Sequence, residues 1–145
     1  MPRSRGVSWN DDLINDYRKN GKATQGPFVG RPVLLLTTAG SKSGAAHTVP
    51  LVYTKDGDDL IIVASKGGAP THPDWFHNLK AHSTVNIELG KERFEAKAIP
   101  TSLETERERL YAAHAEVHPG FLDYVKKTTR KIPVIRLRRL ASAAS

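Results

Sequence analysis

The sequence contains no cysteine and no long apolar run among its 145 residues. The absence of cysteine excludes disulfides, thiolate metal sites and cysteine nucleophiles. No stretch approaches the roughly 18 apolar residues of a transmembrane helix, and none follows the basic N-terminal residues, so we expect neither a membrane span nor a signal peptide. With a hydrophobic content of 39%, the chain is predicted to be one soluble, cytoplasmic domain over residues 1–145.

Signature motifs of several enzyme classes are also absent. The chain has no Gly-x-Ser-x-Gly nucleophile elbow, no G-x-x-x-x-G-K-[ST] phosphate loop and no G-x-G-x-x-G dinucleotide motif. It has no pair of carboxylates placed for hydrolysis. His114 and His118 could share one helix face, but no third ligand accompanies them, so we expect no metal site. If the chain is an enzyme, its reactive atoms belong to a cofactor that the protein holds.

Charge is unevenly distributed along the chain. The formal net charge is +7, and the range Lys126–Arg139 contains seven Lys or Arg residues and no acid. The 22 basic residues less these seven equal the 15 acidic ones, so the rest of the chain is balanced. Such a stretch binds nucleic acid, an anionic membrane surface or an acidic small molecule, or it is a solvated basic edge strand. The residues alone leave these alternatives open.

Apolar periodicity and turn residues divide the chain into helices and strands. The first helix begins near Ser8 and ends at Gly21, and a later one begins at a capping box, Thr101–Glu104. The expected apolar side of that later helix consists of Leu103, Leu110, Tyr111 and Val117. The other expected elements are strands at Val33–Thr38, His47–Thr54, Leu60–Ala64, Thr84–Leu89, Arg93–Ile99 and Ile132–Leu137, and short helices at Asp74–Ala81 and Phe121–Lys127.

The connections between these elements predict the fold class. Strands joined by hairpins rather than by helical crossovers form an antiparallel sheet, and Pro50 assigns its strand to an edge or a bulge. Antiparallel strands with helices at the rim suggest a small barrel, because closure removes exposed edges. We therefore predict a mainly β, α+β domain, in which a six-stranded antiparallel barrel carries peripheral helices.

Two short turns each put a lysine and small residues after an apolar strand. They are Gly40–Gly44, which contains Lys42, and Ser65–Gly68, which contains Lys66. Glycine allows backbone N–H groups to curl around an anion, and the lysine adds charge. Taken alone, Lys42 is more consistent with a solvated turn lysine than with an anion ligand, whereas the glycines of Ser65–Gly68 let a ligand approach the backbone closely. The two turns together, separated by one hairpin, predict a pocket for a phosphorylated or carboxylated molecule.

Four motifs occur in a fixed order along the chain, namely Leu35–Gly44, Val49–Tyr53, Ala64–Ala69 and Pro73–Leu79. In this order they resemble the deazaflavin-dependent nitroreductase family, whose members use reduced coenzyme F420 to reduce nitroimidazoles and quinones. The resemblance runs from about Gly30 to Arg136. It implies a split β-barrel, like that of the pyridoxamine-phosphate oxidases, over residues 30–138, preceded by an N-terminal helix and link over residues 1–25.

The resemblance also implies a binding site for F420. Ser41, Lys42 and Ser43 would hold its phosphate and glutamate tail, residues 47–52 would run along it, residues 63–66 would flank the deazaflavin ring, and residues 74–78 would complete the phosphate side. The predicted cofactor-binding residues are Ser41, Lys42, Ser43, His47, Thr48, Val49, Pro50, Leu51, Val52, Val63, Ala64, Ser65, Lys66, Asp74, Trp75, Phe76, His77 and Asn78. The predicted substrate wall consists of His118, Phe121 and Tyr124.

The chemistry implied by the resemblance is hydride transfer from C5 of the reduced deazaflavin to a quinone, an enone or a nitroaromatic compound. Tyr124 or Ser65 would donate a hydrogen bond or a proton to the developing anion. The sequence departs from the family pattern in two respects. His47 stands where arginine is frequent, and His118 and Phe121 belong to a wall that is often rich in tyrosine. With fewer hydroxyls on this wall, we expect quinone or enone reduction rather than nitroimidazole activation.

Other functions remain open from the sequence. An FMN-dependent reductase of the same fold would use the lysine turns for a shorter phosphate, and a non-catalytic deazaflavin carrier would bind the cofactor without reducing an acceptor. A nucleic-acid binder would use Lys126–Arg139, although the chain lacks the interleaved aromatic and basic residues of single-strand readers. The same stretch could contact the inner face of the plasma membrane if the acceptor is a lipid quinone. A homodimer is also consistent with the sequence.

Overall fold

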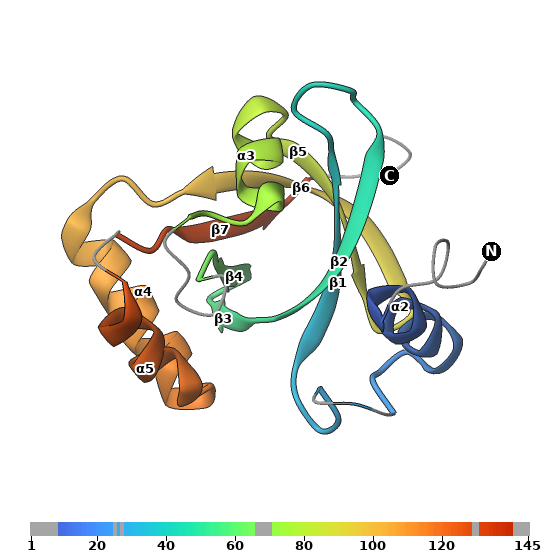
Figure 1. Ribbon diagram of the computed structural model, residues 1–145, viewed down its shortest axis with the longest axis horizontal. Coiled ribbons are helices and arrows are strands. Elements are labelled where there is room, and N and C mark those ends of the chain that lie inside the picture. The colour runs from blue at the N-terminus through green and yellow to red at the C-terminus, as the bar shows by residue number, and fades with distance from the viewer. Residues whose placement is uncertain (1–8, 25, 27, 66–70, 129–130, 141–145) are drawn as a thin grey trace.

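The computed structural model describes residues 9–24, 26, 28–65, 71–128 and 131–140. Within these ranges, seven antiparallel strands form one sheet in the order β2-β1-β5-β6-β7-β4-β3. The strands are β1 (Val33–Ala39), β2 (Ala46–Val52), β3 (Thr54–Asp56), β4 (Asp59–Val63), β5 (Thr84–Leu89), β6 (Glu92–Pro100) and β7 (Val134–Arg139). The helices are α2 (Trp9–Asn20), α3 (Asp74–Ala81), α4 (Glu104–Val117) and α5 (Gly120–Lys127). The sheet curls into a half-barrel, with α2 at one side and α4 and α5 at the other (Figure 1). The predicted antiparallel, mainly β class with peripheral helices is confirmed.

One stretch of chain forms both edges of the sheet. β2 pairs with β1, β3 pairs with β4, and Tyr53 alone separates β2 from β3. The Tyr53 amide donates to the Pro32 backbone oxygen at 3.1 Å, at the end of the β2 ladder. The sequence predicts a single strand over His47–Thr54 and six strands in all, and the division at Tyr53 accounts for the seventh. Pro50 lies on edge strand β2, where a missing N–H is tolerated.

Alternate side chains of β1 separate two hydrophobic clusters. Leu34 and Leu36 face the inside of the curled sheet, and Val33 and Leu35 face α2. The inside cluster also contains Leu60, Ile62, Val85, Ile87, Ala98, Ile135, Leu137, Phe76 and Leu79. A third cluster joins α4 to the opposite faces of β4 and β7. Burial of each large aliphatic side chain contributes roughly 1.5–3 kcal/mol, so these clusters hold the helices against the sheet.

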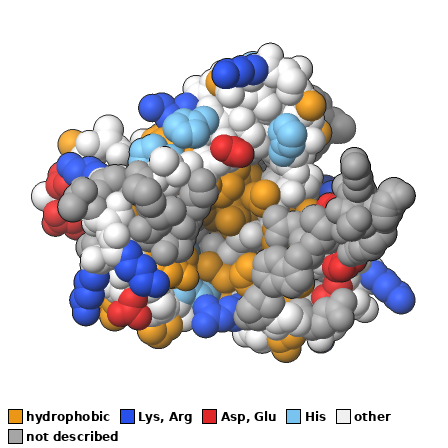
Figure 2. All heavy atoms as spheres, viewed as in Figure 1, with side chains coloured by type: hydrophobic (Ala, Val, Ile, Leu, Met, Phe, Trp, Pro, Cys, Tyr) orange, Lys and Arg blue, Asp and Glu red, His pale blue; other side chains and the backbone are white. Residues whose placement is uncertain are grey.

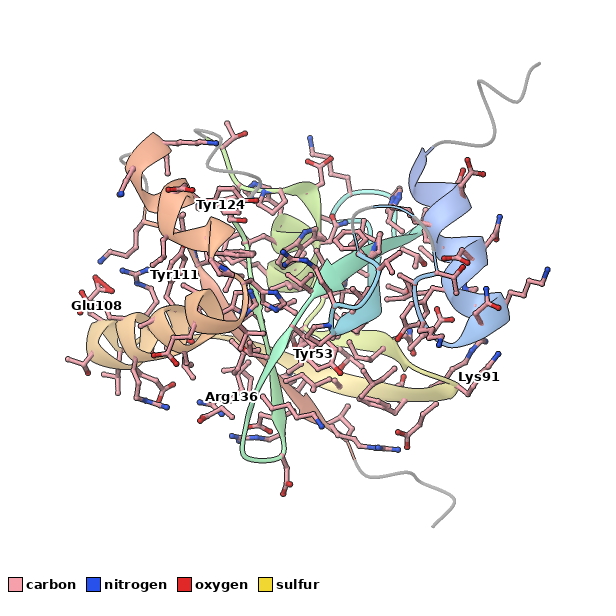
Figure 3. The ribbon with its side chains drawn as sticks, turned by 90° about the horizontal axis from the view of Figure 1, so that it is seen from below. Tyr53, Lys91, Glu108, Tyr111, Tyr124 and Arg136 are labelled. Atoms are coloured by element: carbon pink, nitrogen blue, oxygen red, sulfur yellow. The ribbon has the colours of Figure 1, made fainter. Side chains whose placement is uncertain are left out.

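The first described helix, α2, ends where the sequence predicts. Gly21 has a φ of +73°, and its amide donates to the Tyr17 backbone oxygen at 2.7 Å. The Lys91 ammonium, from the turn between β5 and β6, donates to the Lys19 backbone oxygen at 2.9 Å (Figure 3). The last turn of α2 therefore receives a cation from the sheet. Ser8, the expected cap of this helix, lies outside the described residues.

Helix α4 differs from its prediction at its start and in its buried face. The capping box is wrong, because the Thr101 hydroxyl donates to the Val134 backbone oxygen at 2.9 Å and the N-cap residue makes no side-chain cap. Leu103 and Val117 are exposed, at 66% and 53%, rather than buried. The buried residues of the helix are Leu110, Tyr111, His114 and Ala115. His114 is thus fully buried in this face of the helix.

The basic stretch Lys126–Arg139 ends in an internal strand, not in the edge strand that the sequence suggests. β7 lies between β6 and β4, and its arginines are paired with acids of neighbouring elements. The ion pairs of these arginines are Arg136 with Asp56, Asp59 and Glu106, Arg138 with Asp59, and Arg139 with Glu92. Lys131, which precedes β7, pairs with Glu104. Charges matched in this way attract nucleic acid or anionic lipid less than the sequence suggests. None of the helices in the described ranges is both long and apolar enough to cross a membrane.

Candidate functional site

Two adjoining cavities open beside α3 and β2. The larger, of about 910 Å³, is lined by the turn between β1 and β2, the first half of β2, α3 and a residue of α2. The smaller, of about 500 Å³, is mostly apolar. Val49 and Trp75 line both cavities, which therefore meet at these two side chains. Figure 2 shows hydrophobic side chains gathered in the middle of this face, with histidine and acidic side chains beside them.

The turn between β1 and β2 is held in a compact shape by its own backbone. The Gly44 amide donates to the Gly40 oxygen at 2.9 Å, and Gly44 has a φ of +74°, in the region that favours glycine. A Cβ on Gly40 would lie 2.7 Å from the Ser43 hydroxyl oxygen, so a side chain there would displace Ser43. The turn leaves Ser41 and Lys42 exposed at the wall of the larger cavity.

Asn78 fixes this turn to helix α3. The Asn78 side chain is buried; its Oδ1 accepts from the Ser41 amide at 3.0 Å, and its Nδ2 donates to the Thr38 hydroxyl at 3.1 Å. A buried amide with satisfied hydrogen bonds holds the segments that it joins in one arrangement. Asn78 therefore positions the turn, while Asp74 and His77 of the same helix line the larger cavity.

The larger cavity offers several polar groups for an acidic ligand. The side chains that can donate hydrogen bonds to it belong to Ser41, Lys42, Ser43, His47, Thr48 and His77. Asp74 and Asp11 add negative charge, and Asp11 is a residue that the sequence analysis missed. Directed hydrogen bonds from hydroxyl and ammonium groups suit phosphate and carboxylate oxygens. The residues present therefore fit a phosphorylated, carboxylated tail.

The smaller cavity is formed by β2, the end of β4, α3 and α5. Its aromatic lining consists of Phe28, Trp75, Phe121 and Tyr124. Figure 3 shows Tyr124 on the side of α5 that faces the rest of the molecule. Ser65, which follows β4, adds a buried polar residue to the lining. An apolar cavity with few polar groups fits a flat organic ring.

Two lining residues come from the link between α2 and β1. Phe28 and Arg31 both line the smaller cavity, and the Arg31 amide donates to the Phe28 backbone oxygen at 3.0 Å. The sequence analysis missed both. Glycine and proline residues indicate that this link is neither helix nor strand. Because such a segment has no regular spacing of apolar residues, its sequence does not indicate which side chains face a cavity.

Arg31 and His118 form a hydrogen-bonded pair at this cavity. Arg31 Nη1 lies 3.1 Å from His118 Nδ1, and His118 Nε2 lies 3.1 Å from the Tyr53 backbone oxygen. A guanidinium only donates and a carbonyl only accepts, so the proton of the neutral ring is assigned to Nε2. Burial lowers the pKa of His118, and the adjacent charge of Arg31 lowers that pKa further.

Helix α4 holds α5 in place beneath the smaller cavity. The Tyr111 hydroxyl donates to the Phe121 backbone oxygen at 2.5 Å, and burial raises the pKa of Tyr111 to about 12.

His114 Nδ1 lies 3.1 Å from the Thr54 hydroxyl, whereas its buried Nε2 has no hydrogen-bond partner in the described part of the chain. Burial and then the neighbouring His118 lower the pKa of His114 to about 3. The described residues include no group of three or more His, Asp or Glu that could hold a metal ion.

Most of the predicted site residues lie around the two cavities. Those at the larger are Ser41, Lys42, Ser43, His47, Thr48, Val49, Asp74, Trp75, His77 and Asn78. Those at the smaller are Val49, Pro50, Leu51, Val52, Val63, Ser65, Trp75, His118, Phe121 and Tyr124. Ala64 and Phe76 line neither cavity, because their side chains are buried in the inside cluster of the sheet. Lys66 and the glycines after it lie outside the described residues.

Comparisons with known proteins find relatives over most of this chain. Residues 11–138 match the family model described as F420H(2)-dependent quinone reductase, and this range includes every residue that lines the two cavities. An F420H(2)-dependent quinone reductase of Mycobacterium tuberculosis is 42% identical over 110 residues, which cover 74% of this chain and 74% of that protein.

Two solved structures are similar to this chain. The structure of an F420-H2 dependent reductase (FDR-A) is 38% identical, with a TM-score of 0.68, and covers 74% of this chain and 95% of its own. A second structure, described as a domain-swapped dimer, is 32% identical, with a TM-score of 0.70, and covers 94% of this chain and 100% of its own.

Proposed function

Because the chain belongs to the F420H(2)-dependent quinone reductase family, we propose that it is an oxidoreductase that reduces quinones with electrons from reduced coenzyme F420. The observation that carries this proposal is the meeting of the two cavities at Val49 and Trp75. A cofactor with a phosphorylated, glutamate-bearing tail and a flat ring needs a polar compartment beside an apolar one. The two compartments here adjoin in that way.

The larger cavity binds the tail of the cofactor. Ser41 and Ser43 donate hydroxyl hydrogen bonds, and the Lys42 ammonium adds a charge-assisted one. Asn78 acts indirectly, because it keeps the turn that carries these residues against α3. His47 lines the same cavity, where a ring N–H can donate a hydrogen bond to a phosphate oxygen.

The smaller cavity binds the ring and the acceptor together. The bound deazaflavin supplies hydride chemistry that the side chains cannot. The aromatic residues Trp75 and Phe121 exclude water and orient the acceptor. Ser65 and Tyr124 line the same cavity, and their hydroxyls donate a hydrogen bond or a proton to the acceptor oxygen as it becomes negative.

Oxidation of reduced F420 by menadione, an enone and a nitroaromatic compound tests the proposal. We expect menadione to react fastest, because the acceptor wall offers few hydroxyls to a nitro group. Arg93→Gln is a suitable control, since the Arg93 side chain is 75% exposed on β6 and lines neither cavity. Tight F420 binding without turnover of any quinone would instead indicate a deazaflavin carrier.

FMN is the alternative cofactor. A flavin mononucleotide would occupy the apolar cavity and use only part of the larger one. Titration of the protein with each oxidised cofactor, followed by fluorescence, decides between them. We expect F420 to bind more tightly than FMN. We also expect Lys42→Ala to weaken F420 binding about tenfold, because the variant loses one charge-assisted hydrogen bond. Tighter binding of FMN than of F420 would reverse the assignment.

The relative solved as a domain-swapped dimer gives a reason to examine assembly. That structure is 32% identical and spans 94% of this chain, so a homodimer is a proposal for this protein as well. Size-exclusion chromatography with light scattering, at several protein concentrations, measures the mass directly. A constant mass near 16.0 kDa would exclude the dimer.

A further inference from the structure

Arg31 brings an unmatched positive charge to the smaller cavity. No ion pair among the described residues involves Arg31, whereas all three arginines of β7 have acidic partners. Its side-chain hydrogen bond goes to His118 Nδ1 at 3.1 Å. A guanidinium has five N–H donors in a planar fork, so donors remain for a ligand.

His118 orients Arg31 without cancelling its charge. The ring is 1% exposed, and Nε2 donates to the Tyr53 backbone oxygen at 3.1 Å, which leaves Nδ1 as a fixed acceptor. A carboxylate in the same place would neutralise the guanidinium, whereas a neutral imidazole only directs it. The pair therefore presents an oriented cation to a cavity whose other walls are largely aromatic or aliphatic.

Resting on the proposed function, we infer that Arg31, positioned by His118, binds the acceptor oxygen that becomes an oxyanion when a quinone is reduced. In that step a C–H bond of the reduced cofactor breaks, and its hydrogen and electron pair pass to the quinone. The quinone becomes a hydroquinone monoanion and the cofactor is oxidised. Arg31 keeps its proton throughout. The proton that completes the hydroquinone comes from water through the Ser65 or Tyr124 hydroxyl, and the oxidised cofactor would release one proton to water in return. Oriented donors aimed at such developing charge are a large source of catalysis.

This assignment also specifies a class of ligand. Molecules of quinone shape that already carry an oxyanion should bind to Arg31 more tightly than neutral molecules with the same rings. The enolate of 2-hydroxy-1,4-naphthoquinone and neutral menadione form such a pair of probes. Trp75 lines the cavity, so quenching of its fluorescence reports binding without any turnover. The background variant Trp9→Phe removes the other tryptophan of the chain.

The experiment compares both probes on full-length protein and on three variants. We expect Arg31→Gln to weaken binding of the enolate at least tenfold and binding of menadione less than threefold. His118→Gln should lower the ratio of the enolate affinity to the menadione affinity. A merely structural role would weaken both affinities equally and leave this ratio unchanged. Arg93→Gln, an exposed arginine away from the cavity, should change neither affinity. In the coupled assay with F420, Arg31→Gln should reduce kcat/KM for menadione about 100- to 1,000-fold, the usual cost of one oxyanion donor.

The outcomes separate this inference from the proposed function. Equal losses for both probes, or no loss in Arg31→Gln, would overturn the role of Arg31 even if menadione is reduced normally. Selective loss of enolate binding in a protein that never oxidises reduced F420 would instead refute the proposed function and leave the anion site standing.

Discussion

The rings of His114 and His118 lie with their centroids 4.8 Å apart, both buried, yet their hydrogen bonding is unequal. His118 has partners for both nitrogens, in Arg31 and Tyr53. His114 has the Thr54 hydroxyl at Nδ1 and no partner for Nε2 in the described part of the chain. A protonated His114 would therefore be a buried, poorly solvated charge beside another ring.

Acid should destabilise the protein through His114. The folded-state pKa of His114, about 3, lies below the ordinary histidine value of 6.5, so the unfolded chain binds more protons between these values. Stability is thus full above about pH 6.5 and falls as the pH drops toward 3, by about 1.4 kcal/mol per unit. We expect a loss of about 2 kcal/mol between pH 7 and pH 5 from this group, measured by urea unfolding.

The variant His114→Leu isolates that effect. Leucine removes the titrating ring and keeps an apolar side chain against Phe121, so the slope of stability against pH should flatten over the same range. An unchanged slope would show that another group is responsible. Measurement above pH 5 keeps most carboxylates ionised in both states.

Tyr17 should contribute to stability through its hydroxyl. The hydroxyl donates to the Val33 backbone oxygen and accepts from the Gly90 amide, both at 2.8 Å, and thereby joins α2 to the sheet. Tyr17→Phe leaves both backbone groups without this partner, so we expect a loss of about 1–3 kcal/mol in urea unfolding. Tyr124→Phe removes a hydroxyl from a cavity wall instead and should cost less than about 0.5 kcal/mol.

Arg136 should hold the hairpin of β3 and β4 against β7. Its two Nη atoms lie 2.8 Å from an Asp56 oxygen and 2.9 Å from an Asp59 oxygen, and its side chain is 13% exposed (Figure 3). We expect Arg136→Gln to lower the free energy of unfolding by about 2 kcal/mol, because two neighbouring carboxylates lose their shared partner. The matched control is Arg138→Gln, in which a 60% exposed side chain is removed from Asp59. A cost of about 0.5 kcal/mol or less is expected there, and equal costs would contradict the role of Arg136.

Tyr124 and Ser65 should affect turnover more than binding. Both line the smaller cavity, where a hydroxyl can stabilise charge on the acceptor. We expect Tyr124→Phe or Ser65→Ala to lower kcat/KM for menadione about tenfold, with little change in the affinity for F420. The role of Tyr124 is refuted if Tyr124→Phe retains full kcat/KM on every accepted substrate.

Asn78 should affect cofactor binding without touching the cofactor ring. Its amide joins the Ser41 amide to the Thr38 hydroxyl, so Asn78→Leu frees the turn from α3. We expect the affinity for F420 to fall about tenfold and the affinity for menadione to stay within twofold, by fluorescence titration. Equal losses for both ligands would point to a general loss of structure.

The sequence predicts the elements that begin and end at clear turn residues. The bounds of α3 and β5 agree with their predictions, because Pro73 and Gly90 punctuate the chain beside them. Gly21 ends α2 for the same reason. The apolar face of α4 is predicted only in part: Leu110 and Tyr111 are buried as expected, whereas Leu103 and Val117, which look apolar in a periodicity argument, are exposed. Tertiary contacts, not propensity, determine that face.

Some residues of the candidate site could be predicted from the sequence, and others could not. Residues of the lysine turn and of α3 are predictable because sequence motifs carry them. Arg31 and Phe28 are not, because they belong to an irregular link whose side-chain directions depend on the packing of α2 against β1. Asp11 is recognisable as a favourable first-turn acid of α2, but its place at the larger cavity follows only from the tertiary structure.

The division of one stretch of chain between β2 and β3 has a consequence for local opening. Residue 53 connects the two edge strands, and its backbone oxygen also holds His118. Neither edge can detach far without displacing this residue and loosening the other. Amide hydrogens of β2 and β3 should therefore exchange with solvent as one cooperative unit, at similar opening free energies, although these strands lie at opposite ends of the sheet.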